Sequence, residues 1–225
     1  MKKTKRILTF ITVAYILLTV PVMFVFTKSE YVRFIAIQMV TNWKGKINGL
    51  SDAYIGDSIT AGGRSWNAPF DAINLAGDGY TTWQIENQIG RAEKYDPDNL
   101  LILAGTNDIL SRRIFDLDQF ERDYVNLLDR ALETGKQVFV TQIPYTAGEE
   151  RIQTISDANE VIIRLAGARD LTTIDLNSTV APNGILLPEF TTDGVHLSSR
   201  AYSIWREKIL DAKKQKAEQS SGGNG

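Results

Sequence analysis

A serine, an aspartate and the only histidine of the chain have the types and the spacing that nucleophilic catalysis needs. Ser58 follows a short apolar run that stops at Gly56, which would place its hydroxyl at the end of a strand, where a substrate can reach it. A serine hydroxyl is a weak nucleophile until a base takes its proton. Asp193 and His196 lie three residues apart, so the carboxylate can accept the hydrogen of one ring nitrogen and leave the other free for the proton of Ser58. These residues predict a Ser-His-Asp triad.

Donors for a developing negative charge occur in similar positions. When a serine attacks a carbonyl group, charge develops on the carbonyl oxygen and must meet hydrogen-bond donors that are already in place. The candidates are the backbone N–H of Ser58, an N–H group in the glycine-rich stretch 74–82 and the side-chain amide of Asn107. They predict an oxyanion hole beside the serine.

Each of these motifs also has a purely structural interpretation. Residues 56–58 and 193–194 are ordinary turn sequences, residues 105–108 can close a strand as an Asx turn, and a lone histidine is often a surface residue. These interpretations do not explain why the motifs follow one another at the predicted strand ends, or why the only histidine stands three residues from an aspartate. We therefore favour the catalytic interpretation.

Short apolar runs alternate with longer amphipathic ones from residue 53 onward. The short runs predict strands at 53–56, 72–75, 100–104, 137–142 and 171–175. Helical spacing of apolar residues predicts helices at 82–92, 117–132, 155–166 and 198–216, with Asp118 and Glu121 spaced as a capping box. This alternation, with nearly continuous apolar strands, indicates a parallel sheet covered on both faces. Ligands bind at the carboxyl ends of such strands, where the motifs above would meet.

The composition excludes several classes of function. A formal net charge of −2 gives no basic field for a nucleic-acid backbone, so nucleic acid is not an expected partner. A chain with no cysteine and one histidine cannot build a thiolate or multi-histidine metal site, and we expect no metal and no cofactor. With 225 residues, of which 43% are hydrophobic, the chain is long enough for one globular catalytic domain.

The N-terminal residues predict a single transmembrane helix that anchors the protein. Four cations, Lys2, Lys3, Lys5 and Arg6, precede 21 residues without a charged side chain, residues 7–27. A helix of that length spans about 31 Å, close to the hydrocarbon thickness of a bilayer. The stretch is longer than a signal-peptide core and lacks a small-x-small cleavage pattern, which favours an uncleaved anchor over a cleaved signal peptide. The preceding cations predict a catalytic domain on the periplasmic or extracellular face.

These patterns divide the chain into four segments. Residues 1–28 form the anchor, residues 29–50 a juxtamembrane segment and residues 51–215 the catalytic domain. Residues 216–225 are polar and end in a glycine-rich stretch, so we expect a disordered tail.

Four motifs resemble, in order, the four sequence blocks of the SGNH (GDSL-type) hydrolase superfamily of esterases and lipases. They are Gly56-Asp-Ser-Ile-Thr60, the stretch 74–82, Gly105-Thr-Asn-Asp108 and Asp193-Gly-Val-His196. The resemblance covers about residues 52–210. It implies a flavodoxin-like, three-layer α/β/α fold with a five-stranded parallel sheet. It also implies Ser58 as nucleophile, Asp193 and His196 as the other triad members, and an oxyanion hole from the Ser58 N–H, a glycine N–H of the second block and Asn107.

The second block departs from the family pattern Asn-x-Gly-x-x-Gly-Asp-Thr, whose last glycine is the oxyanion donor. Counted from Asn74, that glycine is Gly79, but Ala76 replaces the first glycine and Tyr80 stands in the place of the aspartate. Gly79 is the predicted donor, and Gly77 remains a rival. Tyr80 is a candidate for the lining of the acyl pocket.

We therefore expect a membrane-anchored serine esterase that hydrolyses a short-chain ester, especially an acetyl ester, through an acyl-enzyme intermediate. Its expected partners are a small-molecule, lipid or glycan ester and the membrane. Two alternatives stay open. An O-acyltransferase would pass the acyl group to an envelope glycan and share the same acyl-enzyme, and a catalytically silent binding module would keep only the fold.

Overall fold

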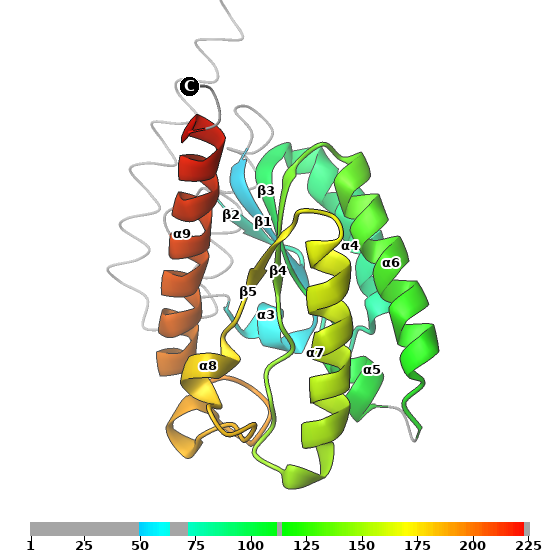
Figure 1. Ribbon diagram of the computed structural model, residues 1–225, viewed down its shortest axis with the longest axis vertical. Helices are drawn as coiled ribbons and strands as arrows, with labels where there is room; N and C mark the ends of the chain where they lie inside the picture. The colour runs from blue at the N-terminus through cyan, green and yellow to red at the C-terminus, as the bar shows by residue number, and fades with distance from the viewer. Residues whose placement is uncertain (1–49, 64–71, 112–113, 223–225) are drawn as a thin grey trace, which may run out of the picture.

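Five parallel strands form one sheet at the centre of the molecule (Figure 1). The computed structural model describes residues 50–63, 72–111 and 114–222. The strands are β1 (Leu50–Gly56), β2 (Ala72–Asn74), β3 (Pro97–Leu103), β4 (Gln137–Thr141) and β5 (Thr172–Ile174). Their order is β2-β1-β3-β4-β5, and every neighbouring pair is parallel. This is the strand order of flavodoxin-like folds, and it confirms the predicted five-stranded parallel sheet.

Alternate strand residues belong to two separate hydrophobic cores, one on each face of the sheet. In β3, Leu100 and Ile102 pack into one core, whereas Leu101 and Leu103 pack into the other. Successive side chains of a strand point to opposite faces, so a sheet that is covered on both faces needs apolar residues at nearly every strand position. This is the physical reason for the nearly continuous apolar runs of the sequence.

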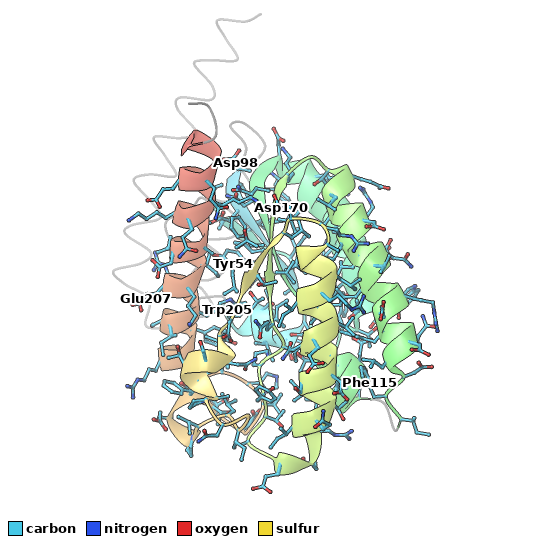
Figure 2. All side chains as sticks on the ribbon, viewed as in Figure 1. Tyr54, Asp98, Phe115, Asp170, Trp205 and Glu207 are labelled. Atoms are coloured by element: carbon cyan, nitrogen blue, oxygen red, sulfur yellow. The ribbon has the colours of Figure 1, made fainter. Side chains whose placement is uncertain are left out.

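Helices cover both faces and complete three layers (Figure 1). On one face lie α4 (Thr82–Ala92), α6 (Leu117–Glu133) and α7 (Ile152–Gly167). On the other lies α9 (Ser199–Gly222), with the short helices α3 (Ser58–Gly62) and α8 (Asn177–Val180). Tyr54 of β1 and Trp205 of α9 pack in the core between the sheet and α9 (Figure 2). The remaining helices are α5 (Thr106–Leu110) and the 3-10 turns η2 (Glu93–Tyr95), η3 (Glu149–Arg151) and η4 (Pro188–Phe190).

The C-terminal helix is longer than predicted, and it includes residues 216–222 of the segment for which we expected a disordered tail. Helix α9 continues through Gly222. The stretch 213–219 consists of lysine, glutamine, alanine and glutamate, which are good helix formers. Two ion pairs extend along it: Lys214 with Glu218 one turn later at 4.0 Å, and Lys216 with Asp170 at 3.1 Å.

The N-terminus of α6 differs from the predicted capping box of Asp118 and Glu121. Its cap is Asp116, whose side chain accepts the backbone N–H of Gln119 at 3.0 Å. Asp116 has extended backbone angles, as a capping residue requires, whereas Asp118 is already inside the first helical turn.

The predicted anchor and juxtamembrane segment lie almost entirely outside the described residues. Within residues 50–63, 72–111 and 114–222, no helix combines the length and the apolar character needed to cross a bilayer.

Candidate active site

Ser58 is presented by a sharp turn between strand and helix. Strand β1 ends at Gly56, and Asp57 caps the following helix α3 by accepting the backbone N–H of Ile59 at 2.9 Å. A side chain at position 56 would collide with its surroundings, because a Cβ there would lie 2.2 Å from the Thr60 hydroxyl oxygen and 2.6 Å from the Leu103 carbonyl oxygen. The turn therefore requires glycine, and it leaves Ser58 half-buried as the first residue of α3.

The three predicted triad residues meet at hydrogen-bond distance. Nε2 of His196 lies 3.0 Å from Oγ of Ser58, although 138 residues separate them in the chain. Nδ1 of the same ring lies 2.7 Å from Oδ2 of Asp193. A carboxylate can only accept, so Nδ1 carries the ring hydrogen and Nε2 is left to accept the proton of the serine. This arrangement can deprotonate Ser58 as it attacks a carbonyl carbon.

The loop that carries Asp193 and His196 is closed by its own hydrogen bonds. Oδ1 of Asp193 accepts the backbone N–H groups of His196 at 2.7 Å and of Val195 at 3.0 Å. The bond to the His196 ring, together with these two N–H groups, lowers the pKa of Asp193 to about 2, so the carboxylate stays ionised. Gly194 between them has φ +92°, a conformation that favours glycine.

A threonine that the sequence analysis did not single out fixes the start of this loop. The Thr191 hydroxyl donates to the carbonyl oxygen of His196 at 2.8 Å and accepts the backbone N–H of Gly194 at 2.8 Å. A threonine two residues before an Asp-Gly turn is a weak local signal, and only the structure reveals its partners.

Ser58 and His196 face a cavity of about 560 Å³. Its other described lining residues are Ala61, Gly62, Asp78 and Gly79. The rival glycine, Gly77, is not part of this lining. Its N–H already donates to the carbonyl oxygen of Gly56 at 3.0 Å. Of these two glycines, Gly79 is therefore the one that lines the cavity of Ser58.

Asn107 lies at the same edge of the sheet, in the first turn of α5 after β3. Its side-chain Nδ2–H donates to the carbonyl oxygen of Tyr80 at 3.0 Å, which leaves the second hydrogen of that amide for another acceptor. Among the described residues, Asn107 is not part of the lining of the Ser58 cavity.

The sequence made Tyr80 a candidate for the lining of the acyl pocket, but Tyr80 is not among the residues that line the Ser58 cavity. It lines a second, smaller cavity of about 220 Å³ together with Gln84, Asn87, Gln88 and Arg91.

Two buried carboxyl groups lie behind the nucleophile. Burial raises the pKa of Asp57 to about 6, and the nearby Asp108 carboxyl adds to this rise, although the backbone N–H of Ile59 offsets part of it. Asp108 accepts the backbone N–H and the hydroxyl of Thr82 at 2.8 and 2.9 Å. In the described part of the chain, no three acidic or histidine side chains come together as metal ligands.

The sequence matches the family model described as the GDSL-like lipase/acylhydrolase family over residues 54–204. The chain belongs to this family. The match confirms the resemblance drawn from the four motifs, and it covers the whole sheet except the first residues of β1.

Solved structures with the same fold include several acylhydrolases. A putative acylhydrolase from Bacteroides fragilis has 22% identity and a TM-score of 0.68, covering 76% of this chain and 89% of its own. A GDSL-like lipase from Bacteroides thetaiotaomicron has 20% identity and the same TM-score, covering 83% of this chain and 99% of its own. An acetyl xylan esterase has 19% identity and a TM-score of 0.59, covering 72% and 99%. The search of curated proteins gave no match.

Proposed function

We propose that this GDSL-like acylhydrolase is a serine esterase with Ser58 as nucleophile, His196 as general base and Asp193 as its orienting acid. One observation carries the proposal: the Ser58 hydroxyl, the His196 ring and the Asp193 carboxylate form a continuous chain of hydrogen bonds of 3.0 and 2.7 Å. Distances of this size allow proton transfer without rearrangement of the side chains.

The reaction follows from the direction of these bonds. Oγ of Ser58 attacks the carbonyl carbon of the ester while its proton passes to Nε2 of His196. The protonated ring then gives that proton to the leaving alkoxide, and an acyl group remains on Ser58. Water repeats the sequence, losing a proton to Nε2 as it attacks the acyl-enzyme, and the serine is regenerated. Asp193 stays ionised throughout and stabilises the ring when it is charged.

The negatively charged oxygen of the tetrahedral intermediate is stabilised, in our proposal, by the N–H groups of Ser58 and Gly79 and by the side-chain amide of Asn107. Gly79 is favoured over Gly77 because the N–H of Gly77 is bonded to Gly56, whereas Gly79 faces the cavity that contains Ser58. Removal of one such donor in other enzymes costs about 10²–10³-fold in kcat.

The acyl group of the substrate is short, most simply acetyl. Besides Ser58 and His196, the described lining of the cavity is Ala61, Gly62, Asp78 and Gly79, none of which is a large apolar residue. A long acyl chain gains about 0.8 kcal/mol per CH₂ only where apolar surface covers it. One protein of the same fold, the acetyl xylan esterase, acts on a short acyl ester by its name.

Replacement of the nucleophile tests the proposal. In Ser58→Ala, hydrolysis of 4-nitrophenyl acetate by the full chain should fall by at least about 10³-fold, and labelling by a fluorophosphonate should disappear. Ser203→Ala is the matched control, because Ser203 is an exposed serine of α9 whose hydroxyl, among the described residues, bonds only the carbonyl oxygen of Ser199. Activity retained in Ser58→Ala would end the triad assignment.

Substrate scope is tested by the acyl length. A series of 4-nitrophenyl esters from acetyl to dodecanoyl should give its highest kcat/KM at two to four carbons, an estimate from the small lining residues. The same reaction with a glycan present, followed by mass analysis of the products, distinguishes hydrolysis from acyl transfer. An optimum at long chains would contradict the short-acyl assignment.

We also propose that residues 1–28 anchor the enzyme in the cytoplasmic membrane with the catalytic domain outside. The full chain should sediment with membranes, resist extraction by carbonate and be cleaved by protease added to intact spheroplasts. A chain that lacks residues 1–28 should leave the membrane fraction. Protection of the full chain from external protease would contradict the proposed orientation.

A further inference from the structure

We infer that Gln88 of α4 is a positioning residue for the nucleophile, which it holds through the backbone of Gly56. This inference rests on the proposed role of Ser58. Oε1 of Gln88 accepts the N–H of Gly56 at 2.9 Å, and Nε2 of Gln88 donates to the carbonyl oxygen of Gly56 at 2.9 Å. Gln88 is only 1% exposed, so water does not compete for these two bonds. Gly56 precedes Ser58 by two residues.

The position of Gly56 in the sheet explains why a side chain is needed there. On one side Gly56 pairs with Leu103 of β3. On the other side the register of β1 with β2 ends at Tyr54 and Asn74, so β2 offers no strand residue opposite Gly56. The carboxamide of Gln88 has one acceptor and at least one donor, as a peptide group does. It supplies the acceptor for the Gly56 N–H on this side, and it bonds the Gly56 carbonyl oxygen together with the N–H of Gly77.

The same carbonyl group also connects the nucleophile to the oxyanion loop. The Gly56 carbonyl oxygen accepts the N–H of Gly77 at 3.0 Å in addition to the Gln88 amide. Gly77 lies two residues before Gly79, the proposed oxyanion donor. Gln88 therefore holds the point at which the first two motif loops join.

Helix α4 is itself fixed to the third motif loop. The backbone N–H and the hydroxyl of Thr82, its first residue, both donate to Oδ2 of Asp108. Asp108 follows Asn107 directly. Through Thr82 and Gln88, one rigid helix thus links the loops that carry the nucleophile and the proposed oxyanion donors.

Packing alone does not call for glutamine at position 88. Its neighbours on the buried side of α4, Ile85, Ile89 and Ala92, are apolar and fully buried, and a methionine of similar size would pack there equally well. Burial of an amide is unfavourable unless its hydrogen bonds are made, so glutamine suits this site because of Gly56. A displacement of about 1 Å at a reacting group can cost about 10²-fold in rate.

Gln88→Glu gives a test with an internal switch. A protonated carboxyl group keeps one donor and one acceptor, whereas a carboxylate has no donor for the Gly56 carbonyl. We expect the kcat of Gln88→Glu relative to wild type to be within about threefold at pH 5 and to fall at least tenfold further by pH 9, with KM changed less than twofold. Gln88→Met, which makes neither bond, should lose at least tenfold in kcat at every pH.

The ratio of the kcat of Gln88→Glu to that of wild type separates the effect of residue 88 from the titration of other groups. Wild type and variant both contain Asp57, which adjoins Gly56, Asp108, which accepts the hydrogen bonds of Thr82, and His196. Titration of these groups affects both rates, so it cancels in their ratio. Asn87→Asp is the matched control, because it adds a carboxylate at the neighbouring exposed position of α4 and should show no such pH-dependent loss. Rates of the full chain in detergent micelles are normalised to the folded fraction, measured by near-ultraviolet circular dichroism.

Each outcome decides the inference. If wild type neither hydrolyses esters nor reacts with a fluorophosphonate, the proposed function fails and this inference fails with it. If wild type is active but Gln88→Met and Gln88→Glu stay within twofold of it at every pH, the positioning role of Gln88 is overturned and the proposed function stands. A pH-dependent loss shared by Asn87→Asp would also overturn it. If Gln88→Glu does not fold, the kcat and KM of Gln88→Met decide.

Discussion

Two adjacent residues at the end of β1 have opposite environments. Ser58 opens onto the cavity, whereas Asp57 is completely buried behind it and caps the helix on which Ser58 stands. Among the described residues, no cationic side chain acts on the carboxyl of Asp57, whereas the carboxyl of Asp108 lies near it. Burial and this second acid favour its protonated form.

The stability of the fold should therefore depend on pH through Asp57. Its pKa is raised from 3.8 to about 6 in the folded chain, so the folded state binds the proton more tightly than the unfolded chain does. The resulting stabilisation is complete below the unfolded pKa and is lost as the pH rises through the folded pKa. Relative to Asp57→Asn, the free energy of unfolding of wild type should fall by about 2 kcal/mol between pH 4 and pH 7.

Urea unfolding of both proteins across this range measures the difference. Asp193→Asn is the control, because the pKa of Asp193 is lowered to about 2 and its stabilising effect is lost only as the pH falls below about 4. Parallel pH profiles for wild type and Asp57→Asn would contradict the assignment of the raised pKa to Asp57.

At the scale of elements, the turn from β3 into α5 is where Asn107 receives its position. Gly105 forms this turn with φ +117°, and a Cβ there would lie 2.5 Å from Cδ1 of Ile143 and 2.9 Å from Cε2 of Phe120. Both neighbours belong to the hydrophobic core and have little freedom to move. The turn into α5 thus depends on a glycine for its angle and for its space.

Gly105→Ala should therefore be much more damaging than a glycine replacement that strains only the backbone. We expect Gly105→Ala to lower the free energy of unfolding by about 3–5 kcal/mol, from the positive φ and the overpacking together. At Gly135 φ is +67°, but no described atom lies within 4 Å of the added carbon, so Gly135→Ala should lower the free energy of unfolding by about 1 kcal/mol. Equal losses in the two variants, measured by chemical denaturation, would contradict this account.

Local patterns predicted the elements better than they predicted the contacts between them. The spacing of Ile85, Ile89 and Ala92 gave the bounds of α4 correctly, because a buried helical face repeats at a fixed interval. The start of β3 was predicted three residues late, because Asp98 and Asn99 are polar. Asn99 is nevertheless buried, and its side-chain amide donates a hydrogen bond to Asp52 of the neighbouring strand β1. Such pairing leaves no local trace in either segment.

The site follows the same division. The motifs identified Ser58, Asp193 and His196 by type and order, and the structure brings these three together. They did not decide between Gly77 and Gly79, since that depends on a hydrogen bond to Gly56. Gln88 was visible only as a polar residue on an apolar helix face.

At the scale of the whole molecule, α9 covers the second face of the sheet, and it begins next to the candidate active site, three residues after His196. Its buried residues are Ala201, Trp205, Ile209 and Ala212, and beyond Ala212 it makes surface contacts such as the ion pair between Lys216 and Asp170. The part of α9 that stabilises the fold therefore ends well before Gly222.

Two truncations test this division of α9. Removal of residues 217–225 should change the free energy of unfolding by less than about 1 kcal/mol, as for ordinary surface changes. Removal of residues 209–225 should cost at least about 3 kcal/mol, because it removes the buried Ile209 and Ala212 and the contact of Lys213 with Asp52 at 2.6 Å. Similar stabilities of the two truncated chains in thermal unfolding would contradict this.

Strand β1 and helix α9 both have their outer ends at the end of the domain away from α3, the helix that begins at Ser58 (Figure 1). β1 runs from Leu50 toward the nucleophile over roughly 20 Å, and α9 starts three residues after His196 and runs back over roughly 36 Å. A solid support, an affinity handle or a fused reporter attached at either outer end would therefore leave the mouth of the cavity unobstructed. Immobilised in this way, the enzyme would turn its catalytic edge toward the solution.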